Sequence, residues 1–150
     1  MIVFLDIDGV LNSHKSYNNG YCGIESDKVV ILNNLIRKHD LKFVISSAWR
    51  YLILTKSMTI RGFENLLLTH GLNVYNRILD HTRQDHHPYE PRENVISDYI
   101  VEKQIKKYII LDDMKLNLPN YYQIKNGLNK TDESNIDKLI KDIKNESNAM

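Results

Sequence analysis

The stretch "IVFLDIDGVL", residues 2–11, decides the fold expected for this chain. Its first four residues are continuously apolar, which is typical of a short strand covered on both faces in a parallel sheet. Asp6 and Asp8 follow this run, and Gly9 gives the backbone the freedom to bend after them. Two like charges at the end of a buried strand are unfavourable unless something neutralises them.

Outward from this strand, apolar runs alternate with helical patterns. Further strands are predicted at 41–47, 72–79, 107–113 and 121–124. Helices are predicted at 27–39, 55–71 and 92–105, with a last helix in the C-terminal segment. Ser26 and Thr131 are the expected N-caps of the first and last helices. This order predicts a three-layer α/β fold with a mainly parallel sheet of about five strands, joined by right-handed crossovers.

Length and composition favour one domain over residues 1–150, with the last few residues frayed. A net charge of +1 gives no overall attraction to nucleic acid or to a membrane surface. The lone Cys22 cannot form an internal disulfide. No apolar run approaches the roughly 18 residues of a membrane helix. We therefore expect a soluble, cytoplasmic protein without a membrane partner.

Polar residues follow three of the predicted strands. They are Asp6 and Asp8 after the first strand, Ser46 and Ser47 after the second, and Asp112 and Asp113 after the fourth. In a parallel sheet these strand ends lie at one edge, where such sheets bind ligands. Each group alone is common in turns, so the joint placement carries the prediction. Carboxylates gathered at one edge repel one another unless a divalent cation neutralises them, and hard oxygen ligands favour Mg²⁺.

The sequence resembles the haloacid dehalogenase (HAD) superfamily of phosphotransferases. "DIDGVL" (6–11) matches its first motif and "YIILDD" (108–113) its fourth. The serines of "FVISS" (43–47) fit the second motif, and Arg92 in "PRENVI" lies where a basic third-motif residue is expected. The intervals between motifs leave no room for a large cap domain. The resemblance therefore implies a capless HAD-like domain.

The resemblance also implies a role for each motif residue. Asp6 would attack phosphorus and form an aspartyl-phosphate, and Asp8 would act as general acid and then general base. One serine hydroxyl would bind a phosphoryl oxygen. Only one can do so while the strand continues, because successive side chains point to opposite faces. Arg92 would balance charge around the nucleophile.

A metal site is implied by the same resemblance. Mg²⁺ would be held by Asp6, by the backbone carbonyl of Asp8 and by one of Asp112 and Asp113. The other carboxylate would support the site without binding the ion directly.

Within the superfamily, the sequence also resembles the HAD domains of RNA-repair (Swiss Army Knife) proteins and the phosphatase half of polynucleotide kinase/phosphatase enzymes. In "SSAWR" (46–50) a serine stands two places before Trp49, as in that subset, which favours Ser47 as the second-motif hydroxyl. Trp49 itself is expected to pack rather than to stack on substrate. "NGLNK" (126–130) is similar to a segment near the end of such domains.

A phosphorylated nucleic-acid end or nucleotide is the expected substrate, since a capless site is open to large molecules. The basic loop over 81–92 would steer a phosphate backbone. The expected substrate-binding residues are Gly9, Arg50, Arg83 and His87, and the alternative for Arg50 is an exposed charge at a helix start. Two alternatives stay open. They are a phosphatase of small nucleotides or sugar phosphates, and a non-catalytic module that sequesters a nucleotide.

Overall fold

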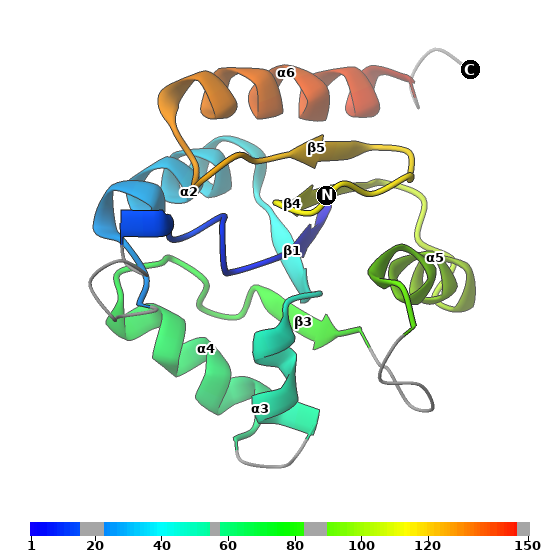
Figure 1. The fold of residues 1–150 in the computed structure, drawn as a ribbon. Helices are drawn as coiled ribbons and strands as arrows, with labels where there is room; N and C mark the ends of the chain where they lie inside the picture. The colour runs from blue at the N-terminus through cyan, green and yellow to red at the C-terminus, as the bar shows by residue number, and fades with distance from the viewer. Residues whose placement is uncertain (16–22, 55–57, 83–89, 147–150) are drawn as a thin grey trace.

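The computed structural model describes residues 1–15, 23–54, 58–82 and 90–146, which form a five-stranded sheet (Figure 1). The strands are β1 (Ile2–Leu5), β2 (Lys42–Ile45), β3 (Ile78–His81), β4 (Tyr108–Asp112) and β5 (Tyr121–Gln123). Their order is β3-β2-β1-β4-β5, and every pairing is parallel. The first strand therefore lies in the middle of the sheet, as predicted.

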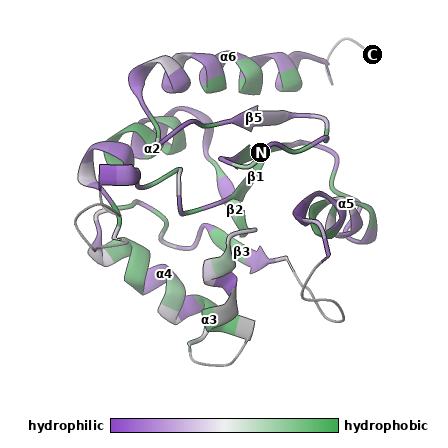
Figure 2. Cartoon of the chain, in the orientation of Figure 1, coloured by the Kyte–Doolittle hydropathy of each residue, from purple (hydrophilic) through white to green (hydrophobic). Residues whose placement is uncertain are grey.

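Helices cover both faces of this sheet. They are α2 (Ser26–His39), α3 (Tyr51–Leu54), α4 (Ile60–Thr69), α5 (Arg92–Glu102) and α6 (Lys130–Glu146), with a 3₁₀ turn at Ala48–Arg50. Buried side chains of α2, α4 and α6 pack on one face, and those of α5 pack on the other. Along α4 and α6, hydrophobic and hydrophilic residues alternate (Figure 2), as expected for helices with one buried side. The predicted three-layer α/β fold is confirmed.

The strand register aligns the ends of the three central strands. Leu5 of β1 pairs with Ile45 of β2 and with Leu111 of β4. The backbone N–H of Asp6 donates to the carbonyl of Leu111 at 3.0 Å, and the N–H of Ser46 donates to the carbonyl of Leu5 at 3.0 Å. The residues that follow each strand therefore start at one level of the sheet edge.

The predicted strand at 72–79 is wrong in position, because β3 covers Ile78–His81. Residues 75–77 form a turn, in which Asn76 has a φ of 57° and the N–H of Arg77 donates to the carbonyl of Val74. Leu72 and Val74 are buried all the same. Their apolar side chains gave a strand-like pattern to a segment that packs on the core as a loop.

The helix predicted over 55–71 begins later, at Ile60, where the Thr59 side chain accepts a hydrogen bond from the N–H of Gly62. Residues 55–57 of that prediction lie outside the described part of the chain. The helix predicted over 92–105 ends at Glu102, and Gln104 has a φ of 53°. The strands predicted at 41–47 and 107–113 are shorter, at 42–45 and 108–112.

Both predicted N-caps are wrong. Ser26 is the first residue of α2, preceded by Glu25, whose carboxylate accepts hydrogen bonds from the N–H and hydroxyl of Ser13. At α6 the cap is Asn129, which receives a hydrogen bond from the N–H of Asp132 and donates its own N–H to that side chain. This reciprocal pair satisfies two N–H groups that Thr131 could not reach together.

None of the helices in the described ranges combines the length and the apolar character that crossing a membrane requires. The frayed tail that the sequence predicts falls mainly on 147–150, which lie outside the described residues.

Candidate functional site

Three carboxylates meet at the ends of β1 and β4. One oxygen from each of Asp6, Asp112 and Asp113 lies within 4.8 Å of the others. Asp6 and Asp112 are buried, whereas Asp113 is exposed. The N–H of Met114 donates to Asp112 at 2.9 Å, which orients that carboxylate. The cluster therefore runs from the sheet edge to the surface, where a ligand in solution can reach it.

Arg92 supplies the positive charge beside these carboxylates. It is the first residue of α5, directly after Pro91, whose fixed φ suits the start of a helix. One guanidinium nitrogen donates to both Asp112 oxygens at 3.0 and 3.1 Å and lies 3.5 Å from Asp6. Arg92 thus lies at the start of a helix next to the carboxylates, and its predicted role at the site stays a prediction.

One arginine does not balance three carboxylates. Burial, together with the charge of Asp112 and a hydrogen bond with Asp113, raises the pKa of Asp6 to about 9. Burial also raises the pKa of Asp112, although Arg92 acts in the opposite direction. The cluster is thus built to accept further positive charge, and its donor set of carboxylate oxygens fits Mg²⁺.

Gly9 allows Asp113 to approach this cluster. It has a φ of 80°, and a Cβ added there would lie 2.2 Å from an Asp113 carboxylate oxygen. The predicted bend after the aspartates is confirmed. The N–H of Gly9 donates to Asn12 at 2.8 Å, so in this structure its contacts are with the protein itself. Its predicted role in substrate binding stays a prediction.

Asp8 lies in the turn after β1 and is held by two side chains. The indole N–H of Trp49 donates to one of its oxygens at 3.1 Å, and the Asn12 amide donates to the other at 3.0 Å. The sequence interpretation missed both contacts. It assigned packing to Trp49 and did not single out Asn12. In the structure Asn12 is completely buried, and buried polar side chains usually form hydrogen bonds.

The two serines at the end of β2 have different surroundings. Both are completely buried. The Ser47 hydroxyl accepts a hydrogen bond from the N–H of Trp49 at 3.2 Å, whereas the Ser46 hydroxyl has no partner among the described residues. Arg50, expected as an exposed helix-start charge or a phosphate contact, is buried and donates to the carbonyls of both serines. The exposed alternative for Arg50 is therefore wrong.

The two ends of the predicted basic loop over 81–92 belong to a strand and a helix in the structure. His81 is the buried last residue of β3, and its ring nitrogen lies 3.1 Å from the carbonyl of Thr82. Arg92 is bound to Asp112. Arg83 and His87, two of the predicted substrate contacts, lie outside the described residues. The described ends of this segment, His81 and Arg92, therefore contact the protein itself, and the predicted steering of a phosphate backbone stays a prediction.

The segment around "NGLNK" supports the turn that carries Asp8. The N–H of Gly127 donates to the carbonyl of Gly9 at 2.8 Å, and that of Leu128 donates to the carbonyl of Val10 at 2.9 Å. The Asn126 side chain accepts from the N–H of His14 at 2.7 Å. This segment, which resemblance alone singled out, thus contacts the first motif directly.

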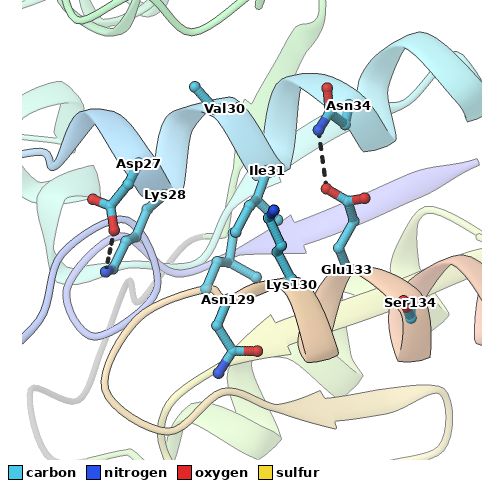
Figure 3. A pocket seen from close by; sticks show the side chains of 10 residues that line it. Asp27, Lys28, Val30, Ile31, Asn34, Asn129, Lys130, Glu133 and Ser134 are labelled. Atoms are coloured by element: carbon cyan, nitrogen blue, oxygen red, sulfur yellow. Dashed lines mark hydrogen bonds and ion pairs between the residues drawn. The ribbon is translucent and has the colours of Figure 1, made fainter.

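A separate surface pocket of about 770 Å³ lies between α2 and the start of α6 (Figure 3). Across it the Asn34 amide donates to Glu133 at 3.0 Å. None of its lining residues is a predicted site residue. The carboxylate cluster is therefore the candidate site, and this pocket is a different feature of the surface.

The chain matches the family model of the HAD domain in Swiss Army Knife RNA repair proteins over residues 2–134. No curated protein and no solved structure matched the chain. The matched range includes all the residues of the cluster, and this family supports phosphatase chemistry of the HAD type in general.

Proposed function

The chain belongs to the family of HAD domains found in Swiss Army Knife RNA repair proteins. On this premise we propose that it is a Mg²⁺-dependent phosphomonoesterase that forms an aspartyl-phosphate on Asp6 and acts on a nucleic-acid end or a nucleotide phosphate. The observation that carries the proposal is the meeting of Asp6, Asp112, Asp113 and Arg92 at one sheet edge.

In the first step, a carboxylate oxygen of Asp6 attacks phosphorus, and a new O–P bond forms. The ester P–O bond breaks, its electron pair stays on the leaving oxygen, and that oxygen takes the proton of the Asp8 carboxylic acid. Arg92 lies 3.5 Å from Asp6 and offers its positive charge to the transferring group. The products are the free alcohol, an Asp8 carboxylate and a phosphorylated Asp6.

In the second step, water attacks the phosphorus of the aspartyl-phosphate. Asp8 takes a proton from this water, the P–O bond to Asp6 breaks, and its electron pair returns to the Asp6 carboxylate. Inorganic phosphate leaves, and Asp8 again holds the proton needed for the next cycle. The two aspartates are therefore not interchangeable, although they are only one residue apart in sequence.

Mg²⁺ would be held by Asp6, by one or both of Asp112 and Asp113, and by the backbone carbonyl of Asp8. When bound, Mg²⁺ neutralises the carboxylates and the phosphoryl oxygens, which lets Asp6 stay ionised as a nucleophile near neutral pH. Of the two serines, Ser46 has the better support as the phosphoryl-binding hydroxyl, because it follows β2 at the level of Asp6 and its buried oxygen lacks a partner among the described residues.

Two observations support a large substrate. The described part of residues 6–41, between β1 and β2, contains α2 and no inserted domain, and Asp113 is exposed at the outer end of the cluster. A site without a cap leaves room for a polymer end beside the phosphate. The family to which the chain belongs is described from RNA repair proteins, which agrees with a nucleic-acid end.

The test is a panel of 3′- and 5′-phosphorylated oligonucleotides, mononucleotides and sugar phosphates, assayed for phosphate release with and without Mg²⁺. We expect Mg²⁺-dependent turnover, fastest on oligonucleotides, and no turnover by Asp6→Asn. Asp142→Asn, which removes an exposed charge from α6, is the matched control and should keep full activity. Full activity of Asp6→Asn would refute the mechanism.

Other outcomes of the panel identify the alternatives. Equal or faster turnover of free mononucleotides would favour a small-molecule phosphatase. Stoichiometric capture of a nucleotide without turnover would favour a sequestering module and would contradict the phosphatase proposal.

A further inference from the structure

We propose that Trp49 is a positioning residue that holds Asp8 for proton transfer to the leaving oxygen, with Asn12 holding the other carboxylate oxygen. The inference rests on the proposed function and adds to it the residues that aim its general acid. Neither residue is expected to contact the phosphoryl group.

Each oxygen of the Asp8 carboxylate accepts a hydrogen bond from a different side chain. The Trp49 indole N–H reaches one oxygen at 3.1 Å, and the Asn12 amide reaches the other at 3.0 Å. A carboxylate held at both oxygens cannot rotate without breaking a hydrogen bond. Each oxygen still has a free lone-pair position, so Asp8 can carry and release a proton without losing either contact.

Trp49 is itself held in place. It lies in the 3₁₀ turn Ala48–Arg50, its N–H donates to the Ser47 hydroxyl at 3.2 Å, and its half-buried ring packs against the main core. Arg50 donates to the carbonyls of Ser46 and Ser47, which fixes the chain leading into this turn. The end of β2 thereby sets the position of a side chain that follows β1.

Asn12 has a second task, which makes it a less selective probe. Its side-chain oxygen accepts the N–H of Gly9 at 2.8 Å while its amide donates to Asp8. Removing it would loosen the turn as well as Asp8. Trp49 has only its indole N–H at the site, and Trp49→Phe removes that donor while keeping an aromatic ring in the core.

The chemistry predicts when these donors matter most. As Asp8 gives up its proton, negative charge develops on its carboxylate, and two N–H donors already in place stabilise that charge in the transition state. A leaving oxygen that is unstable as an anion, such as a nucleoside alcohol, needs this proton. A p-nitrophenolate leaving group is a stable anion and needs it far less.

The experiment compares kcat/KM for a nucleoside monophosphate and for p-nitrophenyl phosphate, because kcat/KM reports the step in which the leaving group departs. For Trp49→Phe we expect a loss of roughly tenfold on the nucleotide, the effect of one hydrogen bond to a charged group. On p-nitrophenyl phosphate we expect a change of less than about twofold. Equal losses on both substrates, or no loss on either, would overturn the inference.

Three further variants keep the test decisive. If Trp49→Phe does not fold, Asn12→Ala should still lower kcat/KM more on the nucleotide than on p-nitrophenyl phosphate, because it frees the other Asp8 oxygen. In an Asp8→Asn background, Trp49→Phe should add no further selective loss. Tyr122→Phe removes the hydrogen bonds of Tyr122 with Asp132 and Asn135 of α6 and should leave both rates unchanged. An inactive wild type would count against the proposed function, whereas an active wild type with an unselective Trp49→Phe refutes only this inference.

Discussion

Replacing Asp6 by Asn is expected to stabilise the metal-free protein even as it removes the nucleophile. Burial and the neighbouring carboxylates raise the pKa of Asp6 from 3.8 to about 9 in the folded protein. Below pH 4 the side chain is protonated in both the folded and the unfolded chain. As the pH rises towards 9, the unfolded chain releases this proton and the folded protein keeps it, so the free energy of unfolding falls.

The size of the effect follows from the pH interval between the two pKa values of Asp6, 3.8 and about 9. Each pH unit between the two pKa values costs about 1.4 kcal/mol. Between pH 5 and pH 8 the wild type would therefore lose up to about 4 kcal/mol of stability on account of Asp6 alone. This is a large part of the roughly 5–15 kcal/mol that stabilises a small domain. Rearrangement of the coupled Asp112 would reduce the loss, so we expect a measured value of about 2–4 kcal/mol.

The assay is urea unfolding of wild type and Asp6→Asn in EDTA at pH 5, 6, 7 and 8. The free energy of unfolding of Asp6→Asn should increase relative to that of the wild type as the pH rises. That of Asp142→Asn, on the exposed side of α6, should equal the wild-type value at each pH. Mg²⁺ added at pH 8 should raise the stability of the wild type and have little effect on Asp6→Asn. A difference between variant and wild type that stays constant within about 0.5 kcal/mol from pH 5 to pH 8 would refute the reasoning.

Three further predictions concern neighbouring features. Gly9→Ala places a Cβ 2.2 Å from an Asp113 oxygen at a φ of 80°, so it should cost about 1–3 kcal/mol in urea unfolding and weaken Mg²⁺ binding in calorimetry. Gly71→Ala, at a φ of 89° with its nearest contact at 3.9 Å, should leave Mg²⁺ binding unchanged, and equal weakening by both variants would contradict this. Ser46→Ala should lower kcat about tenfold or more and Ser47→Ala less, and the reverse order would return the phosphoryl contact to Ser47. Asp137→Asn should cost about 0.5–1 kcal/mol at pH 7, because hydrogen bonds with His39 and Lys141 lower the pKa of Asp137. That contribution is lost as the pH falls through the lowered pKa, so the difference between wild type and variant in thermal melts should shrink as the pH is lowered from 7 into the acid range.

The fold could be predicted because its central pattern is local. The run at 2–5 is apolar at every position, and its neighbours in the sheet, β2 and β4, contain the apolar runs 43–45 and 108–111, so each signals a strand buried on both faces. Parallel strands then bring their ends together without further information. The meeting of Asp6 with Asp112 and Asp113 follows from this topology and needs no knowledge of side-chain packing.

The prediction failed where local pattern and tertiary contact disagree. The residues at 72–77 are apolar enough to resemble a strand, yet a turn at Asn76 delays β3 to Ile78. Thr131 has the chemistry of an N-cap, but the cap of α6 depends on the reciprocal pairing of Asn129 with Asp132. The hydrogen bond from Trp49 to Asp8 joins residues 41 positions apart, so no short motif could indicate it.

The bonds from residues 126–128 to the first motif bear on how the protein is synthesised. All the proposed catalytic groups lie between Asp6 and Asp113, whereas the carbonyls of Gly9 and Val10 in the turn after β1 accept hydrogen bonds from the N–H groups of Gly127 and Leu128. The contact between His14 and Asn126 spans 112 residues, and such long-range pairing forms slowly because a large loop must close first. During translation, the turn after β1 therefore gains these contacts only once residues 126–128 have been synthesised. A product truncated before Ile124 would carry Asp6, Asp8, Asp112 and Asp113 and still lack these hydrogen bonds to the first motif.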